Sequence, residues 1–338
     1  MYKYRKISNN TCVIHIVHGG VIEMKRSTHN QKEEQGVRLE SGSKTQNVGG
    51  ENDRKHRKND HGWKLVSDSG CSLLVPEKTD IDYAVVPFTI SVDGTDYIDG
   101  SDIDAVDMLK HIEESKSGGR TSCPSPHAWL EAWGDSENVI AFTLSAAMSG
   151  SYNSAIAARH MAVEKDPDRN IAVINTCGAG VLPEKMTNII YEGIGDGDSF
   201  ETIVSAVDKA VRGTQVMFAL GSLDNLIKAG RLNKLVGYAA HRFSISAIGV
   251  ASPGGRIELI HKFRGMKKIY GKLIDTLREA GFKGGELVIS HCMNEDGAEK
   301  LGHLVKAEWL DTDVSVVPAS GLCSFYMGKG GMIITYRE

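Results

Sequence analysis

Residues 140–159, IAFTLSAAMSGSYNSAIAAR, hold a predicted strand, a turn of small residues and the start of a helix in one continuous stretch. The apolar residues before Ser145 suit a buried strand, and the apolar spacing after Asn153 is that of a helix. Serine and glycine between them leave backbone N–H groups and hydroxyls in one crevice, where the helix dipole favours an anion. The alternative is an ordinary turn in which Ser149 or Ser151 only caps the helix.

Strand and helix patterns alternate on both sides of this stretch. Apolar runs predict strands at 170–175, 215–220 and 245–251, and a helix pattern fills 200–212. Such alternation is typical of an α/β fold with a largely parallel sheet. We expect one α/β domain over residues 63–222 and a second over 223–338. Two α/β layers with a crevice between them would result.

The first part of the chain has a different composition. Residues 25–61 are rich in charged residues, Asn, Gln and Gly and show no apolar periodicity, so we predict that residues 1–62 form a disordered tail. The basic tract RKHRK at 54–58 is a candidate nucleic-acid contact, although a solvated tail explains it more simply.

Composition limits the classes of function. The chain has 338 residues, of which 41% are hydrophobic and 24% charged, and a net charge of −4, which gives no reason to expect a nucleic-acid partner. Six cysteines without a CxxC pair are typical of reduced thiols in the cytoplasm. Because no apolar run approaches the ~20 residues of a membrane span, and no signal peptide is evident, we expect a soluble cytoplasmic protein.

A second hydroxyl-rich stretch, RTSCPSP, occupies residues 120–126. Pro124 and Pro126 stiffen this predicted loop, so the hydroxyls of Thr121, Ser122 and Ser125 would keep defined directions. Together with the serine turn at 149–151 it forms two neutral, hydroxyl-bearing loops, which suit a carboxylate or a phosphate. The simpler alternative is a pair of surface turns.

Other residues suggest alternative chemistry. Cys123 or Cys177 could act as a nucleophile, but neither has a neighbouring base in the sequence. Asp68, between two serines, could ligate a metal, although capping or bracing of a loop is the simpler role. The histidines lack metal-ligand spacing, and the nucleotide-binding and hydrolase motifs are absent from the sequence.

The order of several motifs resembles the DegV family over residues 64–336. They are Ser67-Asp68-Ser69, Val86-Pro87, Asp99-Gly100, Thr121-Ser122-Cys123-Pro124-Ser125, residues 144–155, residues 223–232 (LDNLIKAGRL), Arg264-Gly265 and Gly328-Lys329-Gly330. Each motif is loose by itself, but their shared order is specific.

This resemblance implies a two-domain α/β fold in which a mainly parallel sheet precedes a mixed sheet, with one fatty acid buried between the domains. It also implies that some members carry the acyl group for a bacterial fatty-acid kinase. Ligand-binding residues implied by the resemblance are Thr121, Ser122, Ser149, Gly150 and Ser151, with Tyr326 at the position of a family histidine, and Arg231 would face the kinase partner or a phosphate.

The chain departs from the family pattern at a few positions. Tyr326 replaces the histidine, Lys329 replaces a proline, and Ala229 replaces the first glycine before Arg231. We therefore expect a lipid-binding protein without catalytic residues, metal or cofactor, and a possible kinase subunit as partner. The alternative from another class is a cysteine-dependent enzyme acting on a small acyl or phosphoryl substrate.

Overall fold

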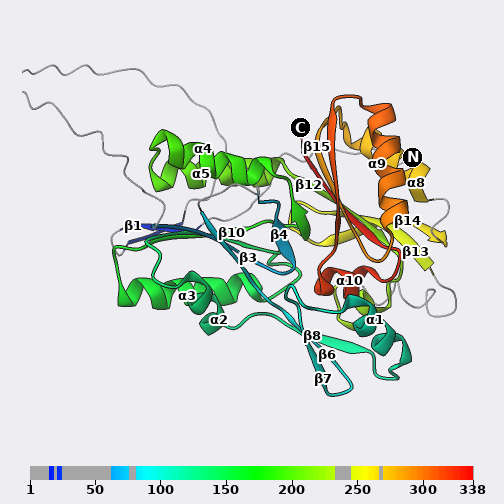
Figure 1. The fold of residues 1–338 in the computed structure, drawn as a ribbon, viewed down its shortest axis with the longest axis horizontal. Helices are drawn as coiled ribbons and strands as arrows, with labels where there is room; N and C mark the ends of the chain where they lie inside the picture. Colours follow the sequence, from blue (N-terminus) through cyan, green and yellow to red (C-terminus); the bar gives the residue numbers. More distant parts are fainter. Residues whose placement is uncertain are drawn as a thin grey trace, which may run out of the picture.

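The computed structural model describes residues 15–18, 21–24, 62–75, 81–232, 245–265 and 269–337. Within this part of the chain two α/β units lie side by side, each built on a six-stranded sheet (Figure 1). The first sheet is mainly parallel and the second is mixed, so the predicted fold class is confirmed.

The first sheet has the strand order β2-β1-β10-β9-β3-β5. Its strands are β1 (His15–His18), β2 (Val21–Met24), β3 (Trp63–Asp68), β5 (Asp82–Val86), β9 (Asn138–Thr143) and β10 (Asn170–Asn175). The four strands from β10 to β5 are parallel, and β1 and β2 add an antiparallel edge.

Helices cover both faces of the first sheet (Figure 1). They are α2 (Pro126–Trp133) and α3 (Ser151–Lys165) on one face, and α4 (Lys185–Asp196) and α5 (Phe200–Gly213) on the other. Alternate residues of β9 face the two helix layers. Ile140 and Phe142 pack with α4 and α5, while Val139 and Ala141 pack with α2 and α3. This two-sided burial explains why the strand is a continuous apolar run.

The strands β1 and β2 fall inside the segment predicted to be disordered. Over these eight residues the structure differs from that prediction, because β1 pairs with β10 and β2 pairs with β1. The β-branched residues on both sides of Gly19-Gly20 account for the strand preference. The rest of residues 1–61, including the basic tract at 54–58, lies outside the described residues.

The second sheet has the strand order β14-β13-β12-β17-β15-β16, and only β15 and β16 pair in parallel. Its strands are β12 (Gln215–Leu220), β13 (Ile245–Ala251), β14 (Ile257–Arg264), β15 (Gly285–His291), β16 (Thr312–Pro318) and β17 (Met332–Arg337). Helices α8 (Ile269–Ala280) and α9 (Glu295–Glu308) cover one face, and α6 (Asp224–Lys228) and α10 (Gly321–Met327) cover the other.

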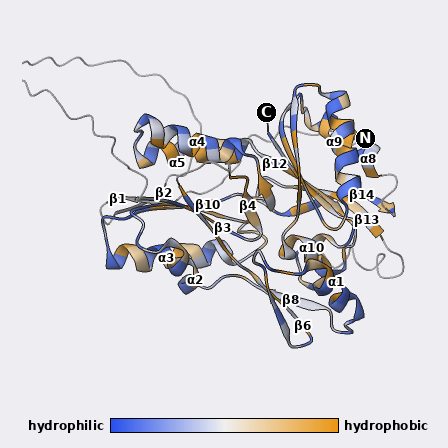
Figure 2. Ribbon diagram, in the orientation of Figure 1, coloured by the Kyte–Doolittle hydropathy of each residue, from blue (hydrophilic) through white to orange (hydrophobic). Residues whose placement is uncertain are grey.

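Two small sheets connect the units. They consist of β6 (Thr89–Val92), β7 (Thr95–Ile98) and β8 (Gly119–Ser122), with α1 (Ala105–Glu114) beside them, and of β4 (Cys71–Leu73) paired with β11 (Gly180–Leu182). The stretch at 120–126, expected to be a loop, thus begins as strand β8 and continues into α2. In Figure 2 the covering helices carry both hydrophilic and hydrophobic residues, as helices on a sheet should.

The border between the units differs from the sequence expectation of residue 222. Strand β12, residues 215–220, already lies in the second sheet between β13 and β17. In sequence, β12 follows α5 in the same alternation of helix and strand as the elements before it. The alternation does not reveal which sheet β12 joins, because this depends on pairing with strands distant in sequence. None of the helices in the described ranges is long and apolar enough to span a membrane.

Candidate functional site

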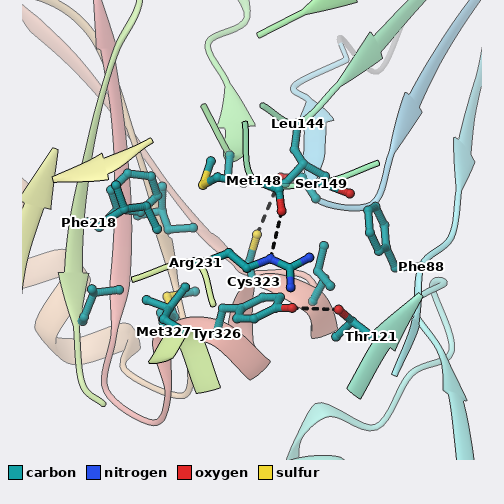
Figure 3. A pocket seen from close by; sticks show the side chains of 17 residues that line it. Phe88, Thr121, Leu144, Met148, Ser149, Phe218, Arg231, Cys323, Tyr326 and Met327 are labelled. Carbon is teal, nitrogen blue, oxygen red and sulfur yellow. Dashed lines mark hydrogen bonds between the residues drawn. The ribbon is translucent and has the colours of Figure 1, made fainter. Parts of the chain in front are cut away.

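An apolar pocket lies where the two units meet. It encloses about 560 Å³ of space free of atoms, part of which is open to solvent. Its wall combines segments of both units, and its apolar side chains are Phe88, Leu144, Met148, Phe218, Leu220, Leu226, Ile257, Leu322, Met327 and Ile333 (Figure 3). A pocket of this size and lining is suited to a small apolar ligand.

Four polar side chains line this pocket: Thr121, Ser149, Arg231 and Tyr326. Arg231 bonds the carbonyl of Met148, next to Ser149, and lies 5.9 Å from the ring of Tyr326, which bonds Thr121, so we call this group the polar end of the pocket. The hydroxyls of Thr121 and Tyr326 lie 2.7 Å apart and share one hydrogen bond, drawn as a dashed line in Figure 3. Each hydroxyl carries one hydrogen, so this bond uses one and leaves the other for a ligand. The polar end can therefore donate to an anion.

Ser149 faces the pocket from the loop between β9 and α3. Its Oγ accepts a hydrogen bond from the backbone N–H of Ser151 at 3.2 Å, so the hydroxyl hydrogen of Ser149 stays available. The hydroxyl of Ser151 does not share this role, because it is fully buried and donates to Asp68 at 2.6 Å. Ser151 lies outside the lining of the pocket.

Arg231 brings a positive charge to the same end. Helix α6 is followed by Gly230, whose φ of 73° lies in the left-handed region that glycine adopts readily, and this turn places Arg231 beside the pocket. Its Nε donates to the carbonyl of Met148 at 2.9 Å and Nη1 to that of Ala229 at 2.7 Å. Both acceptors are neutral, so these contacts leave the charge of the guanidinium uncompensated.

The phenol of Tyr326 comes from α10, a helix that the sequence patterns did not predict. Ser320 caps α10 by accepting from the N–H of Cys323 at 3.2 Å. Asp99 accepts from the N–H groups of Gly321 and Leu322 at 2.6 and 3.0 Å. The signal that could have found the helix is the N-cap serine before an apolar segment.

A more polar hollow adjoins the polar end of the pocket. It shares Met148, Ser149 and Arg231 with the pocket and adds Gly150 and Arg256. The polar end is thereby open to solvent through this hollow.

The structure thus brings together Thr121, Ser149, Tyr326 and Arg231, and it places Gly150 at the mouth. Ser122 does not join them, because it is exposed on β8 outside the lining of the pocket. Successive side chains of a strand point to opposite sides, so Thr121 and Ser122 cannot both face the ligand from β8.

A buried carboxylate lies beneath the serine loop. Asp68 is fully buried and accepts from the N–H groups of Gly70 and Leu144 as well as from Ser151. Burial raises the pKa of Asp68 to about 7, although the hydrogen bonds act in the opposite direction. Among the described residues there is no group of three or more His, Cys, Asp and Glu side chains that could hold a metal. The hydrogen bonds of Asp68 connect it to its own turn and to the loop that follows β9.

Cys123 and Cys323 lack the lowered thiol pKa of an activated nucleophile. Cys123 is exposed beside the serine loop, and desolvation raises the pKa of its thiol. Cys323 lines the pocket, where burial raises its pKa to about 12. Cys177 is half-buried with a φ of 53°. A raised pKa keeps a thiol protonated at neutral pH, which works against nucleophilic chemistry at Cys123 and Cys323.

The chain is similar to proteins of one family. The model of the family described as "Uncharacterised protein, DegV family" matches residues 62–338. A DegV domain-containing protein of Streptococcus gordonii is 35% identical over 277 residues, which are 81% of this chain and 99% of that relative.

Two solved structures share the fold at moderate sequence identity. The Fatty Acid Kinase (Fak) B3 protein of Streptococcus pneumoniae, loaded with linoleic acid, has a TM-score of 0.76 and 33% identity and covers 81% of this chain and 99% of its own. A DegV family protein of Eubacterium eligens, loaded with heptadecanoic acid, has a TM-score of 0.74 and 39% identity with the same coverage of 81% and 99%.

Proposed function

Since the chain belongs to the DegV family, we propose that it binds one long-chain fatty acid in the pocket between its two units. The observation that carries the proposal is a pocket with apolar walls and one connected group of polar side chains, which matches the two parts of a fatty acid. Relatives with 33% and 39% identity hold linoleic acid and heptadecanoic acid.

The carboxylate of the ligand lies at the polar end. It accepts hydrogen bonds from the hydroxyls of Ser149 and of the Thr121–Tyr326 pair, and it faces the guanidinium of Arg231. The acyl chain lies along the apolar wall, where each buried methylene contributes about 0.8 kcal/mol. The apolar wall supplies most of the affinity, and the polar end sets the direction of the ligand.

The bound fatty acid is presented to a kinase subunit, and this chain is the non-catalytic partner. A relative with 33% identity is the Fak B3 protein. The polar hollow that adjoins Ser149 and Arg231 gives a second protein access to the carboxylate, and its two arginines, Arg231 and Arg256, suit a phosphorylated group.

The binding proposal is tested by native mass spectrometry of the freshly purified protein and identification of the extracted ligand. We expect one long-chain fatty acid per chain. The double variant Thr121→Ala/Ser149→Ala should bind added fatty acid at least about tenfold more weakly, because two donors to a charged group are lost.

The matched control is Thr202→Ala/Ser199→Ala, which removes one threonine and one serine hydroxyl that contact each other at the start of α5. The described wall of the pocket includes no residue of α5, so this control should retain its ligand. A protein that is empty when purified and takes up no added fatty acid would overturn the proposed function.

A further inference from the structure

Asp68 occupies a special place under the polar end of the pocket. It ends β3, is fully buried, and receives hydrogen bonds from its own turn and from both ends of the loop between β9 and α3. Gly70 N donates to Oδ1 at 3.1 Å, Leu144 N donates to Oδ2 at 3.1 Å, and Ser151 Oγ donates to Oδ2 at 2.6 Å. Two of these donors, Gly70 and Leu144, themselves line the pocket.

These bonds hold both ends of one loop. Leu144 directly precedes residues 145–150 and Ser151 directly follows them, so one carboxylate fixes the entrance and the exit of the loop. Within the loop, Ser149 accepts from the N–H of Ser151 at 3.2 Å. The position of Ser151 therefore also determines where the Ser149 hydroxyl can point its hydrogen.

No positive side chain compensates Asp68 among the described residues, since none of their ion pairs involves it. The titratable groups that face it are Cys71 of β4, Tyr83 of β5, Cys123 after β8 and Cys323 of α10. Burial raises the pKa of all four, so they are neutral near pH 7. The negative charge of Asp68 is therefore held by neutral hydrogen-bond donors alone.

We propose that Asp68 is a positioning residue of the fatty-acid site, which aims the Ser149 hydroxyl at the ligand carboxylate and takes up a proton when that carboxylate binds. This inference rests on the proposed function. Its first half follows from the bonds that hold the loop, and its second half follows from placing a second negative charge beside a buried one.

Protonation leaves the positioning intact. A carboxylic acid can donate to the Ser151 oxygen across the same short contact, because a hydroxyl both donates and accepts. Protonation of Asp68 therefore removes its negative charge and leaves the loop of residues 145–150 in position. Since burial already raises the pKa of Asp68 to about 7, the ligand carboxylate moves this titration to higher pH. Fatty-acid binding should accordingly weaken as the pH rises above 7.

Calorimetric titration of the delipidated full chain with palmitate, in two buffers of different ionisation enthalpy, measures the protons taken up. For a like-charge interaction of one pKa unit we expect about half a proton per ligand at pH 7.5 and about fivefold weaker binding at pH 8.5 than at pH 6.5. In the Asp68→Asn variant the ligand carboxylate can still change its protonation, as in the wild type, but the proton taken up by Asp68 should be missing. Equal proton uptake by wild type and Asp68→Asn would overturn the proposal that Asp68 takes up a proton when the ligand binds.

The positioning role is tested in Ser151→Ala, which keeps the charge of Asp68 and removes one end of the clamp. We expect about tenfold weaker binding, with proton uptake retained, whereas Ser199→Ala at the start of α5 should bind like wild type. Unchanged affinity in Ser151→Ala would overturn positioning through this bond. Failure of the wild type to bind palmitate at any pH is a different result, because it would overturn the proposed function and this inference together.

Discussion

At the polar end of the pocket, the hydroxyl of Tyr326 can be removed without disturbing the ring that carries it. In Tyr326→Phe the ring keeps its edge-on contact with Phe325, at a centroid distance of 4.8 Å, and stays 5.9 Å from the guanidinium carbon of Arg231. Only the 2.7 Å bond to Thr121 is lost. We expect the free energy of unfolding to change by less than about 1 kcal/mol and the fatty-acid affinity to fall about tenfold.

Isothermal titration with one fatty acid and urea unfolding measure these two quantities. The matched control is Tyr270→Phe in α8, which removes a phenol hydroxyl away from the pocket and should leave the affinity unchanged. An affinity of Tyr326→Phe equal to that of the wild type would show that this hydroxyl does not contact the ligand.

Asp68 should also leave a signature in the stability of the ligand-free protein. Its pKa is raised from 3.8 to about 7 on folding, so its contribution to stability is complete below pH 3.8 and is lost as the pH rises through 7. Between pH 5.5 and pH 8 this amounts to about 2 kcal/mol. Urea unfolding should show that the wild type loses about 2 kcal/mol more over this range than Asp68→Asn. Parallel pH profiles of the two proteins would contradict this expectation.

At the level of single residues, the sequence showed which side chains suit an anion, but it did not show which of them point into the pocket. Thr121 and Ser149 could be chosen because hydroxyls in turns suit an anion, and both line the pocket. Ser122 and Ser151 have the same chemistry, but one faces away from the pocket on β8 and the other donates to Asp68. The direction of a hydroxyl depends on partners distant in sequence, here 83 residues away for Ser151, so local patterns do not contain it.

Among the elements, α10 depends on a distant cap. Asp99 is buried at the end of β7 and accepts from the N–H groups of Gly321 and Leu322, which lie more than 200 residues later in the chain. In Asp99→Ala these two N–H groups lose their acceptor in a buried place, so we expect a loss of about 2–4 kcal/mol in the free energy of unfolding. Because α10 carries Leu322, Tyr326 and Met327 of the pocket wall, the bound fatty acid should also dissociate faster.

Asp104→Ala is the matched control for this helix cap. Asp104 likewise accepts from two backbone N–H groups, those of Val106 and Asp107 at the start of α1, but these bonds are exposed to solvent. Its loss should cost about 1 kcal/mol and leave the dissociation rate of the ligand unchanged. The role of Asp99 would be wrong if both variants had the same effect on dissociation.

Elements with a long apolar run could be predicted closely, and short elements could not. Strands β10, β12 and β13 have the bounds expected from their sequence, since two helix layers or neighbouring strands bury them and select apolar residues. Helix α10 has seven residues and begins with Gly321, which is a poor helix former. Its stability comes from Ser320, Asp99 and its packing in the second core, which only the folded chain brings together.

For the whole molecule, the pocket depends on how the two units meet. Its wall runs from Gly70 to Ile333 in sequence and takes Leu144 and Ser149 from the first unit and Phe218 and Tyr326 from the second. The sequence supported this crevice through the order of the family motifs, because no local pattern specifies which faces of two units come together. For the same reason it assigned β12 to the first unit, although β12 pairs with β13 and β17.

A ligand that contacts both units should therefore stabilise both. At a free ligand concentration of 100 times Kd, binding raises the free energy of unfolding of the protein by about 2.7 kcal/mol. After removal of the fatty acid, we expect faster amide hydrogen exchange in the loop from Leu144 to Ser151 of the first unit and in α10 of the second. Hydrogen-exchange mass spectrometry of the loaded and delipidated chain measures both regions in one experiment.

Helices α2 and α9 provide the internal control, because the core clusters in which they pack contain no residue of the described wall of the pocket. Their exchange through local opening should change little when the ligand is removed. If exchange became faster in one unit only, the fatty acid would contact mainly that unit, and the expectation that it stabilises both units would be wrong. Simultaneous loosening on both sides is expected because the polar end of the pocket is built from Ser149 of one unit and Tyr326 of the other, and neither unit alone completes it.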